Sequence, residues 1–340
     1  MKDNSTLREV AKRAGVAIST ASQALANKPN VSPETRARVL EAAVALGYQQ
    51  QVRVDTPMTN KLSIVGMLTR STPDVPLPAN PFYSYVLAGV ERECQRMNLS
   101  LMYANIEVDE QNRPLMYPPL LHDNRVDGVL VVGSYLKEAI NELNGKPVVL
   151  VDAYAPAQEL DSVVSDNLHG AYNAVSYLVK QGHRKIGLLG SQPDGYPSIR
   201  ERRKGYMRAL KHHHIHESFI EDSPLIREAV YDAALRLLRR CPEITAIFAC
   251  NDNVAVGVIH AAHDLGRDVP GDLSLVGFDD IDLASEIKPA LTTVYVDKLL
   301  LGSTAVRLLR DRSEDPYRTC ITATLATRLV IRDSVRPLKL

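Results

Sequence analysis

From Leu62 onward the chain alternates short apolar runs with amphipathic segments, and this alternation constrains the fold more than any other feature. The apolar runs predict strands at Ser63–Leu68, Leu99–Ala104, Gly128–Val132, Val148–Asp152, Lys185–Leu189, Ala246–Cys250 and Leu273–Phe278. Helical periodicity between them predicts helices such as Tyr83–Met97, Ala171–Gln181, Ile199–His212 and Asn253–Leu265. Strands that alternate with helices form βαβ units and therefore doubly wound parallel sheets. Nearly 280 residues of this α/β pattern are enough for two Rossmann-like lobes with a cleft between them.

Polar residues follow several of these predicted strands. Asp152, Asn251 and Asp279 lie at carboxyl ends, where a doubly wound sheet presents its ligand cleft. Carboxylates and amides hydrogen-bond to hydroxyl pairs, an arginine offers a planar fork, and aromatic rings cover an apolar ring face. The candidate ligand site, which suits a sugar or a nucleoside, comprises Phe82, Tyr83, Asp152, Tyr196, Arg202, Asn251 and Asp279. The alternatives are that Asp and Asn end strands because they favour turns, and that the aromatic residues belong to the core or the rim.

Features typical of an enzyme or a metal site are weak in this sequence. P-loop, GxGxxG, GxSxG and HExxH motifs are absent, so we expect no catalytic residues and no cofactor. The histidines at 212–214 and 216 have no cysteine or carboxylate pair beside them, which favours a solvated turn over a metal site. Asp279 and Asp280 are adjacent, and neighbours in an extended strand point to opposite faces. The four cysteines are scattered, with Cys250 in an apolar run, which predicts reduced thiols.

The first fifty residues predict three short helices. Thr6 and Glu9 form a capping box, so a helix is expected to begin at Leu7. Gly15 breaks its apolar pattern, a second helix follows, and a third starts after Ser32 with Pro33 at its first position. Two short helices joined by a tight glycine turn are typical of a helix-turn-helix, in which the start of the second helix faces the DNA major groove. That geometry exposes Ile18, Ser19, Ser22 and Gln23.

Charge is unevenly distributed along the chain. The net charge is zero overall, which by itself argues against nucleic-acid binding. Residues 1–49 nevertheless hold seven Lys and Arg against four acidic residues. A small basic module on a neutral body is compatible with local phosphate contacts, although chance variation explains so small a surplus equally well.

These motifs resemble the lactose/galactose repressor family of bacterial transcription regulators. The resemblance rests first on the run Thr6–Val16, then on Thr20, Ser22, the run Val31–Arg36, and Gly47-Tyr48. It continues through the body in Asn80–Tyr83, Val126–Gly128, Asp166-Asn167, Gly182–Gly187, Arg202, Gly205-Tyr206, Asn251-Asp252, Val276–Asp280 and Leu291–Val294. The resemblance therefore implies a helix-turn-helix domain followed by a periplasmic-binding-protein-like body.

The resemblance also implies which residues contact DNA. They are Thr6, Leu7, Ala17, Ile18, Ser19, Thr20, Ser22, Gln23, Asn30, Val31, Ser32, Arg36, Tyr48, Arg53 and Pro57. Two of them depart from the family pattern. Ala17 stands where the family usually has a serine that caps the recognition helix, and Gln23 stands where it often has arginine. Glutamine pairs with adenine whereas arginine favours guanine, so we expect an operator with adenine at the Gln23 contact.

The linker departs further from the family pattern. In the family this stretch folds as a hinge helix on DNA and places a leucine pair in the minor groove; here Pro57 occupies the expected leucine position. Proline can insert as an apolar wedge, but inside a helix it costs about 3 kcal/mol. Arg53 can still follow the phosphates. Whether the hinge folds as a helix is therefore open.

Together these features predict a ligand-responsive transcription regulator. Its expected partners are operator DNA, a sugar-like effector and a second copy of the chain. The expected domains are residues 1–49, a linker at 50–61, and a body at 62–340. Within the body we expect an N-lobe at about 62–164 plus 293–322 and a C-lobe at about 165–292 plus 323–340. No apolar signal core or membrane-length segment occurs, so we expect a cytoplasmic protein without membrane contact. The alternatives are a sugar-transport receptor and a Rossmann-type enzyme; the sign of the ligand response, induction or corepression, stays open.

Overall fold

A computed structural model describes residues 7–25, 31–46, 62–71, 80–108, 114–122, 125–133, 136–143, 145–155 and 159–338. The chain divides into two compact units, Met1–Thr59 and Asn60–Leu340. Within the described ranges, no helix combines the length and the apolar character needed to cross a membrane.

The described part of the first unit is helical: α1 (Leu7–Ala14), α2 (Ile18–Leu25) and α3 (Pro33–Ala45). Gly15 between α1 and α2 has a φ of +64°, a left-handed conformation in which glycine has no Cβ penalty. Ser32 caps α3, because its hydroxyl accepts a hydrogen bond from the Thr35 N–H at 3.3 Å. Val10, Ala21 and Val39 are fully buried where the three helices meet. The helix-turn-helix predicted from the sequence is therefore present.

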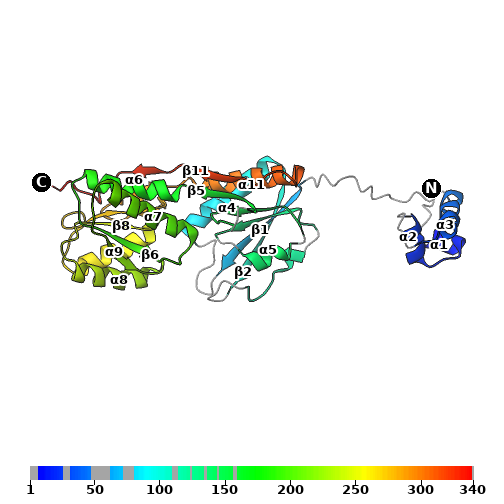
Figure 1. Ribbon diagram of the computed structural model, residues 1–340, viewed down its shortest axis with the longest axis horizontal. Coiled ribbons are helices and arrows are strands. Elements are labelled where there is room, and N and C mark those ends of the chain that lie inside the picture. The colour runs from blue at the N-terminus through cyan, green and yellow to red at the C-terminus, as the bar shows by residue number, and fades with distance from the viewer. Residues whose placement is uncertain are drawn as a thin grey trace. The chain divides into compact units, whose positions relative to one another are not determined.

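Two parallel sheets form the body of the second unit (Figure 1). The first has the strand order β11-β5-β4-β3-β1-β2. Its strands are β1 (Ile64–Ser71), β2 (Ser100–Glu107), β3 (Gly128–Val132), β4 (Val148–Val151), β5 (Asp161–Ser165) and β11 (Thr322–Leu325). The second has the order β7-β6-β8-β9, with β6 (Ile186–Ser191), β7 (Phe219–Asp222), β8 (Ala246–Ala249) and β9 (Ser274–Val276). This arrangement confirms the doubly wound α/β fold predicted from the alternating pattern.

Helices cover both faces of the two sheets. They are α4 (Pro81–Arg96), η2 (Pro119–His122), α5 (Lys137–Asn141), α6 (Asn167–Lys180), α7 (Pro197–His212), α8 (Arg227–Arg240), α9 (Asp252–Asp264), α10 (Leu283–Glu286) and α11 (Lys298–Glu314). In β3, Leu130 and Val132 belong to the apolar cluster that includes residues of α4 and α11, whereas Val129 and Val131 belong to the cluster on the α5 side. Both faces of the strand are buried, which explains why its sequence is apolar throughout.

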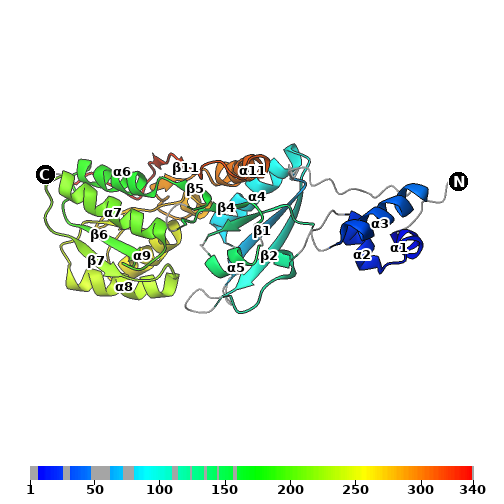
Figure 2. The same cartoon turned by 45° about the vertical axis from the view of Figure 1, so that its right-hand side comes forward.

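We call the first sheet with α4, α5 and α11 the first lobe, and the second sheet with α6–α9 the second lobe. The chain passes between them after β5, after β9, and between β11 and β12 (Arg328–Val330). β12 pairs antiparallel with β10 (Thr293–Tyr295). β11 pairs with β5 as far as Leu325, a few residues beyond the expected crossing at about residue 322. In Figure 2, α11 and α4 lie over the first sheet, and α6 and α7 lie over the second.

The strands that periodicity did not predict are β5, β7, β10, β11 and β12. β5 has the sequence Asp-Ser-Val-Val-Ser, yet every residue of it is buried. Because only the two central valines of β5 are apolar, hydrophobic periodicity does not identify this segment as a strand. Asp161 is buried because Arg312 and Arg318 pair with its carboxylate. The predicted strands differ from the observed ones by up to three residues at their ends.

We expect Gly302→Ala to destabilise the second unit by about 1–3 kcal/mol, although alanine is the better helix former. A Cβ on Gly302 of α11 would lie 2.1 Å from the Val86 carbonyl oxygen and 2.8 Å from the Val90 nitrogen, both on α4. The two helix backbones would have to separate. Urea unfolding measures the change, and Ser303→Ala on the same helix serves as a control expected within about 0.5 kcal/mol of the parent. Equal stability of Gly302→Ala would contradict this close helix crossing.

Candidate functional site

A cavity of about 310 Å³ lies between the two lobes of the second unit. All seven residues predicted for the ligand site line it: Phe82, Tyr83, Asp152, Tyr196, Arg202, Asn251 and Asp279. The carboxyl ends of parallel strands face this cavity from both lobes, as doubly wound sheets require of a ligand site. The topology therefore brings together side chains that are separated by up to 197 positions in the sequence.

Arg202 on α7 connects several residues in and around the cavity wall. Its Nη2 lies 3.0 Å from Asp279 Oδ1, its Nε donates to Asn167 Oδ1 at 2.9 Å, and its Nη1 donates to the Cys250 carbonyl oxygen at 2.6 Å. The guanidinium also stacks on the ring of Phe278, 3.8 Å from its centroid. With 4% of its surface exposed, Arg202 is a buried cation whose partners fix it on several sides.

Asp152 faces the cavity from the end of β4. Its Oδ2 accepts a hydrogen bond from the Tyr83 hydroxyl at 2.9 Å. Its Oδ1 is buried and accepts no hydrogen bond from the described residues, whereas the buried Asp279 Oδ1 has Arg202 Nη2 as its ionic partner at 3.0 Å. An unpartnered buried carboxylate oxygen is costly, so Asp152 Oδ1 is available to accept a hydrogen bond from a donor in the cavity.

Burial shifts the titration of these carboxyl groups. It raises the pKa of Asp152 to about 6, although Arg202 and the Tyr83 hydroxyl act in the opposite direction. Burial also raises the pKa of Asp279, against the lowering effects of Arg202 and Lys298. The folded protein therefore binds a proton on Asp152 more tightly than the unfolded chain does.

The Asp152→Asn variant tests this shift through the pH dependence of stability. Since the folded pKa of Asp152 lies above its ordinary value of 3.8, ionisation destabilises the native state as the pH rises from about 4 through about 6. The amide does not ionise but can still accept the Tyr83 hydrogen bond. We expect the variant to gain on the order of 1 kcal/mol relative to the parent between pH 4.5 and pH 7.5. Urea unfolding at the two pH values measures it, and a constant difference would contradict the shift.

Asn251 has a second role besides lining the cavity. Its Oδ1 accepts a hydrogen bond from the Val254 N–H at 2.8 Å and so caps α9. The amide nitrogen is the part that a ligand can use. The turn-forming alternative considered for this residue therefore coexists with its position in the cavity wall.

The Asp279-Asp280 pair is not extended as the sequence suggested. Both residues have positive φ values, 103° and 51°, in the turn that follows β9. Asp279 faces Arg202, whereas Asp280 Oδ1 accepts from Arg332 Nη2 at 2.7 Å. The two carboxylates still diverge, but the turn, and not strand alternation, is the reason.

The histidine run follows the end of α7. His213 Nε2 lies 3.0 Å from the Ser176 hydroxyl, and His212 packs its ring edge-on against Tyr172. The run thus takes part in the contact between α6 and α7. Across the described ranges, no group of three or more His, Cys, Asp or Glu side chains is placed to hold a metal ion.

Sequence reasoning did not identify eight further residues in the cavity wall. Four of them are polar: Arg70, Asn80, Ser198 and Asn253. The others are Gly133, Ile199, Leu225 and Ile281. Arg70 and Gly133 lie at or just beyond the carboxyl ends of β1 and β3, so the rule that identified Asp152 applies to them too. Ile281 and Leu225 come from loops whose approach to the cavity only the tertiary structure shows.

In the first unit, the residues of α2 that were predicted to contact DNA are mostly exposed. Ile18 is 46% exposed, and Ala17, Ser19 and Gln23 are exposed as well. Thr20 is partly buried. Ala17 sits at the cap position, where the Ala21 N–H bonds to its carbonyl oxygen at 2.9 Å, and its methyl side chain offers no capping oxygen.

The other predicted DNA contacts differ in their placement. Val31 is only 7% exposed and belongs to the apolar core of the unit, so its side chain packs inward and can contribute only its backbone to a DNA contact. Ser32 is exposed and Arg36 is partly buried. Leu7 and Ser22 lie on α1 and α2. Thr6, Asn30, Tyr48, Arg53 and Pro57 fall outside the described residues, as does the linker.

Comparison with known proteins identifies both units. Residues 6–51 match the lacI family of bacterial regulatory proteins, and residues 175–335 match the periplasmic binding protein-like domain. The HTH-type transcriptional repressor PurR of Photobacterium profundum is 32% identical over 98% of this chain and 99% of its own length. The repressor CytR of Escherichia coli K12 is 32% identical over 98% and 97%.

Solved structures give the same result. A transcriptional regulator CelR–cellobiose complex is 27% identical, with a TM-score of 0.71, over 97% of this chain and 100% of that chain. A LacI family transcriptional regulator from Enterococcus faecium with bound ribose is 28% identical, with a TM-score of 0.69, over 82% and 100%.

A helix-turn-helix unit joined to a two-lobed body with a polar cavity defines a ligand-responsive DNA-binding transcription regulator. The chain belongs to the lacI family of bacterial regulatory proteins. The family resemblance seen in the sequence is therefore confirmed.

Proposed function

We propose that this chain is a transcriptional repressor that binds a pseudo-palindromic operator as a homodimer and responds to a small sugar in the cavity between its lobes. The observation that carries the ligand class is the buried Asp152 Oδ1, which accepts no hydrogen bond from the described residues and lines the cavity together with the ion-paired Asp279. Sugar hydroxyls are donors that can satisfy such an oxygen. The relatives named as repressors and the neighbours with bound cellobiose and ribose support the same assignment.

The proposed ligand contacts are the seven residues predicted from the sequence, with Arg70, Asn80, Ser198 and Asn253 added from the cavity wall. The proposed domain limits are a DNA-binding domain at 1–49, a linker at 50–61, and a ligand-binding and dimerisation body at 62–340, which agrees with a division of the chain near Thr59. We infer a binding role and not a catalytic one, because the named relatives are repressors. A protein that binds operator DNA acts in the bacterial cytoplasm.

The ligand acts on DNA binding through linkage. If DNA and ligand favour different arrangements of the two lobes, each weakens or strengthens the binding of the other by the same factor. Dimerisation supplies two recognition helices, and a two-fold dimer requires an operator with two related half-sites.

The experiment that tests this function is a titration of the full-length protein onto DNA from its own upstream region at fixed salt, with and without mono- and disaccharides. Specific binding that a sugar abolishes supports an inducible repressor, and binding that a sugar strengthens supports a corepressed one. Specific binding that no sugar changes would contradict the sugar assignment and keep the regulator. Failure to bind any DNA specifically would contradict the proposed function as a whole.

Gln23 predicts a feature of the operator. The side chain is exposed on α2, and glutamine can form two hydrogen bonds with adenine N6 and N7. Selection from a random DNA library is expected to enrich adenine at the Gln23 contact in each half-site. The Gln23→Arg variant is expected to enrich guanine there instead, by a factor corresponding to about 1–3 kcal/mol. Enrichment of guanine by the parent protein would contradict the predicted contact between Gln23 and adenine.

A further inference from the structure

Arg70 lines the cavity but has no ionic partner among the described residues. It is the penultimate residue of β1, and its Nε is buried without a hydrogen-bond acceptor. The group that faces its guanidinium is the ring of Tyr196, 5.4 Å from Arg70 Cζ to the centroid. Burial lowers the pKa of Arg70, and no carboxylate acts against that effect. The wall of the cavity thus contains a partly desolvated cation without a carboxylate partner among the residues that the structure describes.

Arg202 differs from Arg70 in its partners. It lines the same cavity, but it has a carboxylate, an amide oxygen and a carbonyl oxygen as partners. Both cavity carboxylates, Asp152 and Asp279, interact electrostatically with Arg202, and Arg70 is not among the charges that shift either of them. Arg70 lies near Tyr83, whose hydroxyl acts electrostatically on Arg70 and donates to Asp152, but no carboxylate among the described residues pairs with Arg70. A partly buried cation without a counter-ion is costly unless a ligand supplies the negative charge.

The part of the cavity wall beside Arg70 has a second source of positive potential. Tyr196, which faces Arg70, is the cap residue of α7, and its side chain makes no capping hydrogen bond. Ser198 and Ile199 of the first turn of this 16-residue helix line the cavity. Backbone N–H groups at a helix N-terminus favour an anion. Arg70 and the start of α7 thus converge from different lobes.

We propose that the effector is a sugar carrying an anionic group, a phosphate ester or a carboxylate, and that this group binds between Arg70 and the first turn of α7. The proposal rests on the sugar-binding function inferred above and specifies its substrate class. The hydroxyl groups of the sugar reach Asp152 and Asp279, and the anionic group reaches Arg70 and the start of α7. A neutral sugar can donate to the carboxylates but brings no negative charge to Arg70.

The anion also gives Arg70 a means of joining the lobes. Arg70 belongs to β1 of the first lobe, and the start of α7 belongs to the second. An anionic group between them pairs with both, so it stabilises the closed arrangement of the cleft by a contact that a neutral sugar cannot make.

The test is calorimetric titration of the full-length protein with matched sugars. The probes are glucose and glucose 6-phosphate, ribose and ribose 5-phosphate, gluconate, and inorganic phosphate alone. We expect at least one anionic sugar to bind about 10- to 100-fold more tightly than its neutral counterpart, the factor typical of hydrogen bonds to charged groups. Preference for the phosphate esters or for gluconate distinguishes the two anionic groups.

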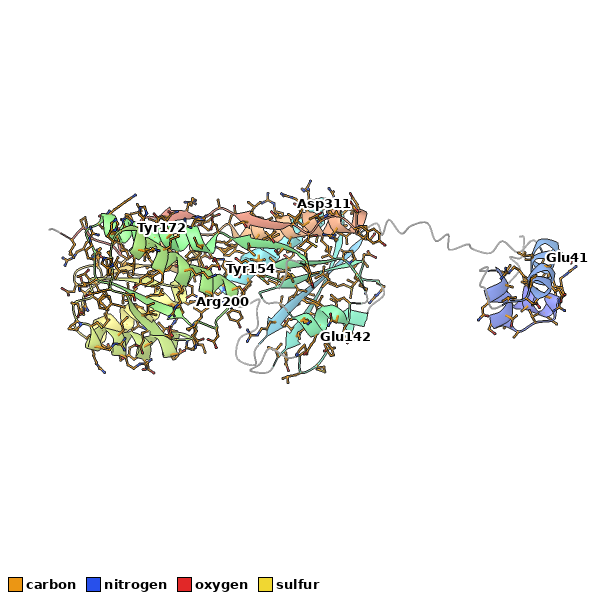
Figure 3. All side chains as sticks on the ribbon, in the orientation of Figure 1. Glu41, Glu142, Tyr154, Tyr172, Arg200 and Asp311 are labelled. Atoms are coloured by element: carbon orange, nitrogen blue, oxygen red, sulfur yellow. The ribbon has the colours of Figure 1, made fainter. Side chains whose placement is uncertain are left out.

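Three variants assign the effect to Arg70. Arg70→Gln is expected to remove most of the preference for the anionic sugar, measured as the ratio of its affinity to that of the neutral sugar for the same variant. Arg70→Lys keeps the charge but loses the planar fork, so we expect it to retain part of the preference. Arg200→Gln is the matched control. Arg200, labelled in Figure 3, lies in the first turn of α7, is exposed, and is not among the residues that line the cavity. We expect that variant to bind like the parent.

Two results would overturn the proposal. The first is that no anionic sugar binds more tightly than its neutral counterpart, and the second is that Arg70→Gln keeps the full preference. Either result leaves the sugar-responsive repressor in place if a neutral sugar still changes operator binding. If specific DNA binding itself is missing in the parallel titration, the proposed function fails independently of Arg70.

Discussion

Arg202→Met is expected to destabilise the second unit by about 3–5 kcal/mol and to abolish binding of the sugar. The variant removes the cation that lies 3.0 Å from Asp279 and leaves that carboxylate buried without its ionic partner. It also leaves the Asn167 side chain and the Cys250 carbonyl oxygen without a donor. Methionine fills much of the volume beside Phe278, so the loss reports on the polar contacts more than on packing.

The pH dependence separates the charge effect from a general loss of packing. Without Arg202, the pKa of Asp279 is expected to rise further above its ordinary value, because Arg202 is the largest of the influences that lower it. The destabilisation is then largest at neutral pH and decreases as the pH falls and Asp279 becomes protonated in the folded state. Urea unfolding at pH 7.5 and pH 5 measures this difference.

Two further variants serve as controls for Arg202→Met. Arg200→Met removes an exposed arginine from the same helix and is expected to change the free energy of unfolding by less than about 0.5 kcal/mol. The double variant Arg202→Met, Asp279→Asn removes both charges and is expected to recover part of the lost stability. A loss that does not change with pH, together with no recovery in the double variant, would contradict the ion-pair explanation.

Asp161→Ala is expected to cost about 3–5 kcal/mol in the first lobe, without a direct effect on the cavity. The Asp161 side chain is fully buried at the start of β5, with Arg312 Nε at 2.8 Å and Arg318 Nη2 at 2.7 Å. Its Oδ1 also accepts from the Ile321 N–H at 2.6 Å. This carboxylate therefore joins β5 to the end of α11 and to the segment that leads into β11, and its removal leaves two guanidinium groups facing each other.

The control for Asp161→Ala is Glu314→Ala. Glu314 is 66% exposed and pairs with Arg310 at 3.6 Å, the geometry of a surface ion pair. We expect it to contribute less than about 0.5 kcal/mol, because solvent screens such pairs. Chemical unfolding followed by far-UV circular dichroism compares the two variants, and equal effects would contradict the structural role assigned to Asp161.

The family and the general fold were predictable from local sequence features. Capping residues, the Gly15 turn and short-range periodicity mark the helices of the first unit, because those features act within one helical turn. Apolar runs such as Gly128–Val132 mark strands that are buried on both faces. The positions of Asp152 and Asp279 after such strands predicted residues of the cavity, since parallel strands end at a common edge.

The tertiary structure decided what depends on contacts between distant segments. β5 and β11 are strands because they pair with each other and because Arg312 and Arg318 neutralise Asp161, and neither cause is local in the sequence. Val31 lies in the core of its unit, although the family resemblance placed it among the DNA contacts. Arg70 and Arg202 have the same chemistry in the sequence, yet one is paired and the other faces the cavity without an ionic partner among the described residues. Periodicity records which residues are buried, whereas the partner of a buried charge is set by the packing of the whole unit.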